Sequence, residues 1–435
     1  MIRNSKRPMP RMFSTAGYGI RFRFKTDVGK GAKTIQAQQV QPNRANDPGY
    51  SKGNNDIVAT LPTLDLDRNS ADAVIVRPLN ILNQIQPPES LRTNHNYETG
   101  SEMDHDRDML TLAVSYTMLG RLEPWKEYFV DYFSRYIATE LVPFDDGRNG
   151  WRYIVLPLAH LDDLVMDTVL SAAAFHFAGN VNNQILQPHT LYQSAIHKLR
   201  DRQDLTIYDM EGQRSILLSL LVILVTAMVN GRPDFRTAFG LLEAAVNAIG
   251  GEAALMADES GIFIIRQLHK YQRYISPLLS WEKGVARLSQ SIPSSSNKEW
   301  EEFAFYYQTH PHSEDSWSLV YSLHEQACNI YVTRALERPQ CLPRVDLVSR
   351  FISTLDNLPS GSPGTHILPW MIFMAAAESS DLIQQQYFEQ VLLRSYERNG
   401  FANILMAVGH LREIWSRQSG QNWTDILPHL PIFVV

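Results

Sequence analysis

The sequence is poor in cysteine: Cys328 and Cys341 are the only two among 435 residues. They lie thirteen positions apart, and no Cys-x-x-Cys pair occurs. These residues can therefore assemble neither a disulfide framework nor a zinc site built from cysteine. Two isolated thiols are typical of a protein in a reducing compartment, the cytosol or the nucleus.

Positive charge is not in excess either. The 46 Asp and Glu residues outnumber the 40 Lys and Arg residues, which gives a formal net charge of -6 at pH 7. A chain devoted along its whole length to nucleic acid or to an anionic membrane would carry the opposite sign. The hydrophobic share of 44% and the charged share of 20% are those of an ordinary globular protein.

Long hydrophobic runs are also scarce. The most apolar stretch is SILLSLLVILVTAMV, at Ser215–Val229. As a helix it reaches roughly 22 Å at about 1.5 Å per residue, which is short of the ~30 Å hydrocarbon layer of a membrane. The stretch predicts a buried core helix, and no membrane partner is expected. The N-terminus has no apolar segment of the kind that directs secretion.

The N-terminal residues are basic, and no acidic residue precedes Asp27. We interpret this arm as a source of weak, non-specific phosphate contacts or as a nuclear import signal. An Arg-rich, acid-poor start is also typical of mitochondrial transit peptides, but Pro8 and Pro10 interrupt the amphipathic helix that such a peptide needs. The basic side chains of the arm are Arg3, Lys6, Arg7, Arg11, Arg21, Arg23 and Lys25.

Three regions follow from composition and periodicity. Residues 1–60 are polar and predict a disordered basic arm. Residues 61–103 hold short apolar clusters interrupted by prolines and predict a linker. Residues 104–435 show apolar positions at helical spacing almost throughout and lack the alternating pattern of strands. The predicted class is all-α, a large multi-helix domain.

The expected helices of this domain are placed by their apolar spacing and by their Gly, Pro and Asn boundaries. A segment at Tyr153–Leu158 is predicted to be interrupted at Pro157. The other predicted helices lie near Met109–Leu119, Trp125–Ile137, Leu164–Phe177, Leu191–Leu199, Ser215–Val229, Asp234–Ile249, Ile262–Leu279, Trp317–Leu336, Val345–Leu355, Leu368–Ala377, Leu382–Tyr396 and Ala402–Arg417.

One acidic cluster, Asp162, Asp163 and Asp167, suggests two chemistries. In α-helical enzymes of the isoprenoid type, such a cluster holds magnesium and a diphosphate, but that chemistry needs a second metal-binding patch, which we do not find. Alternatively, Asp162 and Asp163 start a helix, where carboxylates accept hydrogen bonds from free backbone N–H groups. The sequence contains no His-Glu-x-x-His and no Gly-x-Ser-x-Gly motif. We therefore predict no enzyme, and no catalytic, cofactor-binding or metal-binding residue.

Several sequence blocks resemble one known family. From residue 104 to the end, the chain resembles the fungal-specific transcription factor domain that follows Zn2Cys6 zinc clusters, in the branch similar to the acriflavine sensitivity control protein. A further block, GYGIRFRF at Gly17–Phe24 within residues 17–25, is similar to the segment that follows the last zinc-binding cysteine in that branch. The blocks of the helical domain are Tyr128–Phe144, Leu156–Gly179, Leu191–Arg200, Ser215–Gly251 and His366–Ser379, with a final Trp423.

The resemblance implies a nuclear regulator of fungal gene expression, for example of a secondary-metabolite or other metabolic gene cluster. It implies partners as well: related regulators in a homo- or hetero-oligomer, and the transcription machinery. The family's DNA reader needs six cysteines and two zinc ions, which this chain does not supply. We therefore expect no cofactor, and either a product that lacks the zinc cluster or a missing upstream segment. The competing hypotheses are the isoprenoid-type enzyme and a helical scaffold protein, which includes a mitochondrial one.

The last residues, LPHLPIFVV at Leu427–Val435, are more hydrophobic than a free tail. We predict that they pack back onto the helical domain or onto a second copy of the chain.

Overall fold

The structure is a computed structural model. It describes residues 122–180, 187–289, 309–337, 344–417 and 421–434. These residues belong to one compact unit. The predicted basic arm, linker and first helix near Met109–Leu119 lie outside the described residues.

The described residues are almost entirely helical and contain no β-strand, which confirms the all-α class. The helices before residue 290 are α2 (Pro124–Tyr132), α3 (Leu156–Leu161), α4 (Asp163–Asn180), α5 (Pro188–Asp201), α6 (Met210–Asn230), α7 (Phe235–Ala248), α8 (Glu252–Leu255), α9 (Glu259–Leu279) and α10 (Trp281–Leu288). Those after residue 308 are α12 (Glu314–Leu336), α13 (Val345–Asp356), α14 (Leu368–Glu378), α15 (Leu382–Asn399), α16 (Ala402–Arg417) and α17 (Trp423–Ile426).

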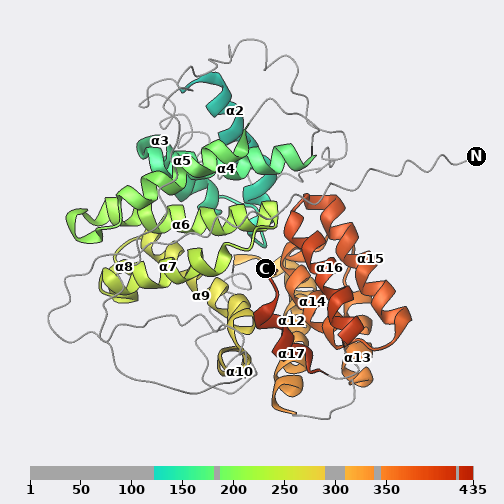
Figure 1. Ribbon diagram of the computed structural model, residues 1–435. Helices are drawn as coiled ribbons and strands as arrows, with labels where there is room; N and C mark the ends of the chain where they lie inside the picture. Colours follow the sequence, from blue (N-terminus) through green and yellow to red (C-terminus); the bar gives the residue numbers. More distant parts are fainter. Residues whose placement is uncertain (1–121, 181–186, 290–308, 338–343, 418–420, 435) are drawn as a thin grey trace, which may run out of the picture. The chain divides into compact units, whose positions relative to one another are not determined.

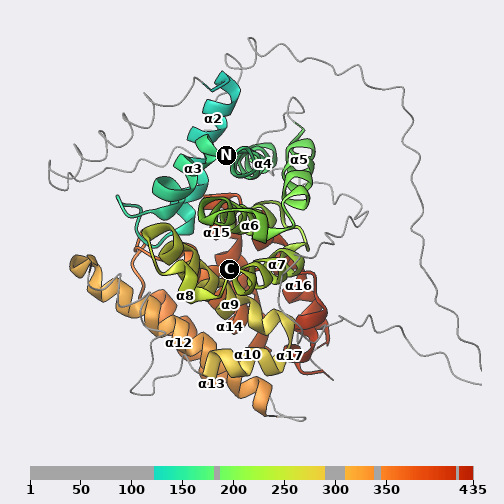
Figure 2. The same cartoon turned by 90° about the vertical axis from the view of Figure 1, so that its left-hand side faces the viewer.

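Helix α6 is the central core helix of the first group. Its residues Ser215–Val229 are all buried, and it packs against α4, α7, α9 and α16 (Figures 1 and 2). The Asp209 side chain caps its start by accepting the Gly212 N–H at 2.9 Å, and Gly231 ends it in the left-handed conformation with φ 68°. The predicted burial of this segment is confirmed.

The observed α6 is longer than the predicted segment. Its 21 residues make it long and apolar enough to cross a membrane, but 83% of its most apolar window is buried inside the protein. The helix gains its extra turns from residues 210–214, which the hydrophobic run alone did not include. Burial on all sides is typical of a core helix.

Two further helices bury nearly their whole surface. Helix α4 lies against both α5 and α6 (Figure 1), and its run Ala172–Ala174 is fully buried. Small side chains allow neighbouring helix backbones to approach closely. In the second group, α14 is buried along all eleven residues and contacts α12, α13, α15 and α16. Each group of helices is thus built around one apolar helix.

The helix boundaries differ from the prediction at Pro157. The backbone stays helical there, because a π-helical turn at Trp151–Val155 runs directly into α3. Pro157 occupies the first turn of α3, where the missing N–H of proline removes no helical hydrogen bond. The predicted interruption is therefore wrong: the change from π to α geometry absorbs the proline.

The C-terminal segment packs back onto the domain, which confirms the first of the two predicted placements. Leu427, Leu430 and Phe433 are buried. Arg236 of α7 donates to the carbonyl oxygens of Pro428 at 2.6 Å and of Leu430 at 2.8 Å. The segment therefore contacts helices from both groups, since α9 and α16 also lie against it.

Candidate functional site

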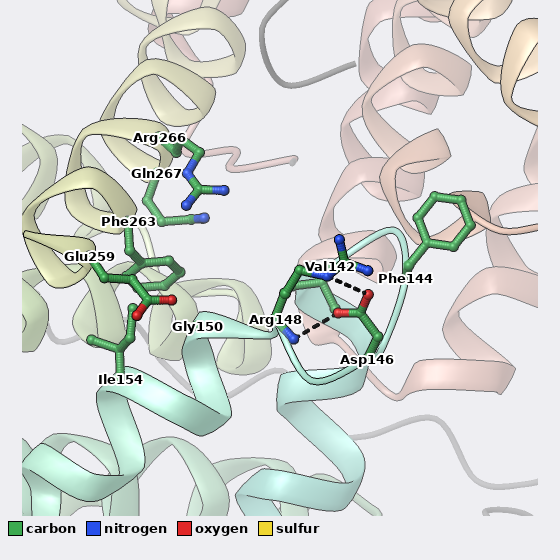
Figure 3. Close-up of a pocket in the computed structure, with 10 residues that line it drawn as sticks. All are labelled: Val142, Phe144, Asp146, Arg148, Gly150, Ile154, Glu259, Phe263, Arg266 and Gln267. Carbon is green, nitrogen blue, oxygen red and sulfur yellow. Dashed lines mark hydrogen bonds and ion pairs between the residues drawn. The ribbon is translucent and has the colours of Figure 1, made fainter. Parts of the chain in front are cut away.

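A pocket opens between two walls that are distant in sequence (Figure 3). The first wall is the stretch that follows the 3-10 turn Ala138–Leu141, and it contributes Val142, Phe144, Asp146, Arg148, Gly150 and Ile154. The second wall is the start of α9, which contributes Glu259, Phe263, Arg266 and Gln267. These four residues share one face of the helix, because their spacing of three, four or seven residues repeats the helical turn.

The first wall is held between two π-helical turns, Phe133–Ile137 and Trp151–Val155. Asn149 fixes the loop between them: its amide donates to the Ala138 carbonyl at 3.0 Å and to Asp145 at 2.9 Å. Its side-chain oxygen also accepts the backbone N–H of Trp151 at 3.1 Å. Isolated π turns are rare and frequently occur at functional sites.

The second wall begins at a cap. The Asp258 side chain accepts the backbone N–H of Gly261 at 2.9 Å, which starts α9. A Cβ atom at Gly261 would lie 1.8 Å from the Leu255 carbonyl oxygen, so only glycine allows α8 and α9 to meet this closely. Contact between the two walls has the same requirement: a Cβ at Gly150 would lie 2.3 Å from the Phe263 ring.

The charged groups of the first wall are paired with one another. Asp146 accepts the backbone N–H of Arg148 at 2.8 Å and contacts the Arg148 guanidinium at 3.2 Å (Figure 3). His310 adds a second contact to Asp146, at 3.1 Å. The His310 ring also stacks on Phe144 with 3.8 Å between ring centroids. The Asp146 carboxylate is thus compensated within its own wall.

The second wall continues into a row of buried polar residues on α9. Gln267 is 8% exposed, Lys270 7% and Arg273 4%. The Lys270 ammonium donates to the Leu141 carbonyl at 3.2 Å. The amide oxygen of Gln267 is buried and accepts no hydrogen bond from any described residue. An unsatisfied buried polar group costs stability, so its presence beside a pocket points to a function.

The cations of α9 also affect a histidine on α12. His324 is fully buried, and burial together with the nearby Arg273 charge holds the pKa of this imidazole well below its ordinary value. The imidazole is therefore neutral at physiological pH. No group of three or more potential metal-ligating side chains occurs in the part of the chain that the structure describes.

The pocket itself is small. Its volume of about 40 Å³ corresponds to room for about three water molecules, at roughly 10–15 Å³ each. Such a space accepts a chemical group of a few atoms, while the remainder of a ligand would lie at the mouth beside Phe144.

Comparison with known families identifies the domain that contains this pocket. Residues 127–281 and 264–434 match the family described as the fungal-specific transcription factor domain. The two stretches overlap and together cover well over half of the chain. The chain belongs to this family. No curated protein and no solved structure matches it.

Both walls of the pocket lie within the matched residues of the fungal-specific transcription factor domain. The match confirms the resemblance derived from the sequence blocks, and it places the chain among proteins of transcription regulation. A domain of this family is not an enzyme by descent, and the geometry around the pocket is consistent with a binding function.

The acidic cluster predicted from the sequence has a structural role in this domain. Asp162 precedes α4 and accepts the Leu164 N–H at 2.8 Å, as a helix-start carboxylate does. It also accepts a hydrogen bond from Arg202 at 2.6 Å. Burial raises the pKa of Asp162, but the bonds from Arg202 and Leu164 outweigh burial and hold the pKa below its usual value.

The other two aspartates are paired with α5 as well. Lys198 contacts Asp163 at 2.9 Å and Asp167 at 2.8 Å, and Ser194 donates to Asp167 at 2.6 Å. The structure therefore brings the three carboxylates together with two cations, where they join α4 to α5. Cations in these positions neutralise the charge that a magnesium ion would need.

The seven basic residues proposed for phosphate contact or nuclear import, Arg3, Lys6, Arg7, Arg11, Arg21, Arg23 and Lys25, all lie outside the described residues. The pocket residues were not predicted from the sequence. A signal was present, however: Gln267, Lys270 and Arg273 place polar groups on the apolar face of the predicted helix Ile262–Leu279.

Proposed function

We propose that this chain acts in the nucleus as a regulator of fungal gene expression, through its helical transcription factor domain. The observation that carries the proposal is the family match over residues 127–434, which spans almost every described helix. The net charge of -6 supports a regulatory body rather than a DNA-coating one.

In this proposal, the basic arm supplies nuclear import or weak phosphate contacts. Lys and Arg contacts to phosphate position a protein on DNA without reading its sequence, and they weaken steeply as salt rises. Within these residues, two cysteines cannot build the Zn2Cys6 reader. We propose that sequence specificity comes through a homo- or hetero-oligomer with related regulators, which also contacts the transcription machinery.

The genes under its control are proposed from the resemblance of the sequence blocks. Regulators of the similar branch act on metabolic genes, and a secondary-metabolite cluster is the target that we propose here.

Imaging and chromatin enrichment test the proposal together. The full chain, tagged at its N-terminus and at its C-terminus in separate strains, is expressed in a fungal host, imaged, and then crosslinked to chromatin. We expect nuclear fluorescence and enrichment at a limited set of promoters. Mitochondrial fluorescence with cleavage of the N-terminal tag would instead support the transit peptide interpretation.

The matched control replaces the seven basic residues of the arm by glutamine. If they act in import, nuclear fluorescence of the variant falls while the protein remains folded. If they act only as phosphate contacts, the variant stays nuclear and its chromatin enrichment becomes weaker.

A further inference from the structure

The pocket between the 142–154 stretch and α9 has the chemistry of a ligand site. We propose that it binds a small organic acid with an apolar body and a hydroxyl group next to the carboxylate. The carboxylate lies at the Arg266 end, the hydroxyl faces Gln267, and the apolar body lies beside Phe144 and Phe263.

The argument for an acid rests on the distribution of charge along α9. Arg266, Lys270 and Arg273 follow one another at spacings of four and three residues, and no acidic residue occurs on α9 between Glu259 and Arg273. Lys270 and Arg273 are both buried, and a buried cation favours a nearby anion far more than a solvated one does. The pocket therefore has a positive end.

The two carboxylates that line the pocket do not cancel this end. Asp146 is already compensated by Arg148 and by His310 on the opposite wall. Glu259 lies seven residues before Arg266 on α9, which places it roughly 10 Å away at 1.5 Å per residue. Figure 3 shows Glu259 at the Ile154 side of the wall, whereas Arg266 and Gln267 lie together further along the helix.

Gln267 specifies the second group of the ligand. Its buried amide oxygen is an acceptor that no described residue satisfies, so a ligand that donates a hydrogen bond here removes the cost of an unmet acceptor. A hydroxyl on the carbon next to the carboxylate places a donor within a few ångströms of the anion, and the adjacent positions of Arg266 and Gln267 match that separation.

The size of the pocket and its aromatic residues define the rest of the ligand. A volume of about 40 Å³ accepts a carboxylate and a hydroxyl, which together occupy about the space of three water molecules. Phe144, which stacks on His310, and Phe263, which lies edge-on to Trp151, line the same pocket. Aromatic side chains next to a few polar groups are typical of small-molecule sites.

Calorimetry on the purified full chain tests the proposal with three probes. Mandelate carries the acid, the hydroxyl and a ring; phenylacetate lacks the hydroxyl; mandelamide lacks the charge. We expect mandelate to bind with Kd on the order of 1 mM, phenylacetate about fivefold more weakly, and mandelamide at least tenfold more weakly. Equal affinity for the three probes, or no binding of mandelate at 20-fold above ~1 mM, would overturn the proposal.

Variants assign the binding to this pocket. Gln267→Leu removes the amide and should abolish the preference for mandelate over phenylacetate, because the hydroxyl then has no acceptor. Arg266→Gln should weaken mandelate about tenfold. Glu259→Gln should leave mandelate affinity unchanged or strengthen it, since the variant removes a negative charge from the pocket.

Arg135→Gln, at an exposed pair with Asp131, is the matched control for loss of an arginine outside the pocket. If Arg266→Gln does not fold, as judged by its melting transition, Arg148→Gln on the exposed wall takes its place. Mandelate affinity that is the same in Gln267→Leu and in the parent chain contradicts the assignment.

The regulatory meaning of such a ligand rests on the proposed function, but its binding to the purified chain does not. Nuclear enrichment without mandelate binding would remove the ligand and leave the regulator. Mandelate binding by a chain that never reaches chromatin would remove the regulator and leave the site.

Discussion

Glu378 ends α14 with only 1% of its surface exposed and with a full set of hydrogen-bond donors. Arg334 donates to both carboxylate oxygens, at 2.7 and 2.6 Å. The Arg344 backbone N–H donates at 2.8 Å and the Trp423 indole at 2.7 Å. This one carboxylate therefore links α12, the start of α13, α14 and α17. Buried charge is tolerated here because every lone pair has a partner.

Replacing this carboxylate should be costly. Glu378→Gln leaves the Arg334 guanidinium largely buried without a counter-charge, and we expect a loss of about 3–5 kcal/mol in the free energy of unfolding. Urea denaturation measures it. The control is Glu389→Gln, whose partner Arg412 has 56% of its side chain exposed and which should cost at most about 1 kcal/mol. Equal losses in the two variants would contradict the account.

His176 makes stability depend on pH. Its Nδ1 accepts the Tyr132 hydroxyl at 3.0 Å, and its Nε2–H donates to the Asn399 carbonyl at 2.6 Å. Burial lowers the pKa of this imidazole from 6.5 to about 4, although the bond to Asn399 acts the other way. The folded state therefore keeps the ring neutral, whereas the unfolded chain takes up a proton below about pH 6.5.

The sign of the pH effect follows from these two pKa values. The stabilisation by neutral His176 is present above pH 6.5 and is lost as pH falls toward 4. Between pH 7 and pH 5 we expect a loss of about 2 kcal/mol from this residue. Unfolding measured at both pH values should show a smaller difference in His176→Gln. A difference as large as in the parent chain would be the contrary result.

At the scale of elements, the α8–α9 junction depends on a glycine without a side chain. A Cβ at Gly261 meets the Leu255 backbone, whereas nothing lies within 4 Å of a Cβ at Gly240 in α7. We expect Gly261→Ala to lose about 3 kcal/mol of stability. Gly240→Ala should gain up to about 1 kcal/mol, because alanine favours the helix. Thermal unfolding of the two variants should shift in opposite directions.

The helices were predictable from the sequence because each long one shows apolar spacing between recognisable ends. The predicted Ala402–Arg417 matches α16, and Ile262–Leu279 matches α9 apart from its first turn. The short helix α8 was missed because four residues give no periodic pattern, and α10 because its apolar face is narrow. The start of α5 at Pro188 was missed because it depends on a proline in the first turn.

The pocket could not be predicted in the same way. Its walls meet across more than a hundred residues of sequence, from Phe144 to Gln267, and the contact depends on glycine at position 150, where a Cβ would meet the Phe263 ring. Local spacing carries no information about such a contact. The acidic cluster showed the reverse: three aspartates suggested a metal site, but the cations that occupy it, Lys198 and Arg202, come from a later helix.

At the scale of the whole described domain, the C-terminal segment joins the two groups of helices. Phe433 stacks on Phe235 with ring centroids 4.7 Å apart, and its carbonyl accepts the Asn403 amide at 2.9 Å. α7 and α16 are thereby connected through one residue. The domain should therefore unfold as one unit rather than as two.

Shortening that residue should weaken the whole domain. Phe433→Ala removes a ring that is 3% exposed, and we expect a loss of about 3–5 kcal/mol in a single transition seen by far-UV and near-UV circular dichroism. Ile383→Ala, at a position 75% exposed, should change stability by less than about 0.5 kcal/mol. Two separate transitions in the parent chain would show that the groups unfold independently.

The function of the molecule as a whole can be measured by tethering. The full chain is fused to a heterologous DNA-binding module in a fungal host, and transcription of a reporter carrying that module's site is measured. Regulation through the helical domain predicts reporter output that differs severalfold from that of the module alone, that is kept in Gly240→Ala, and that is lost in Gly261→Ala. A folded fusion that occupies the site and leaves the reporter at the level of the module alone would contradict the central claim.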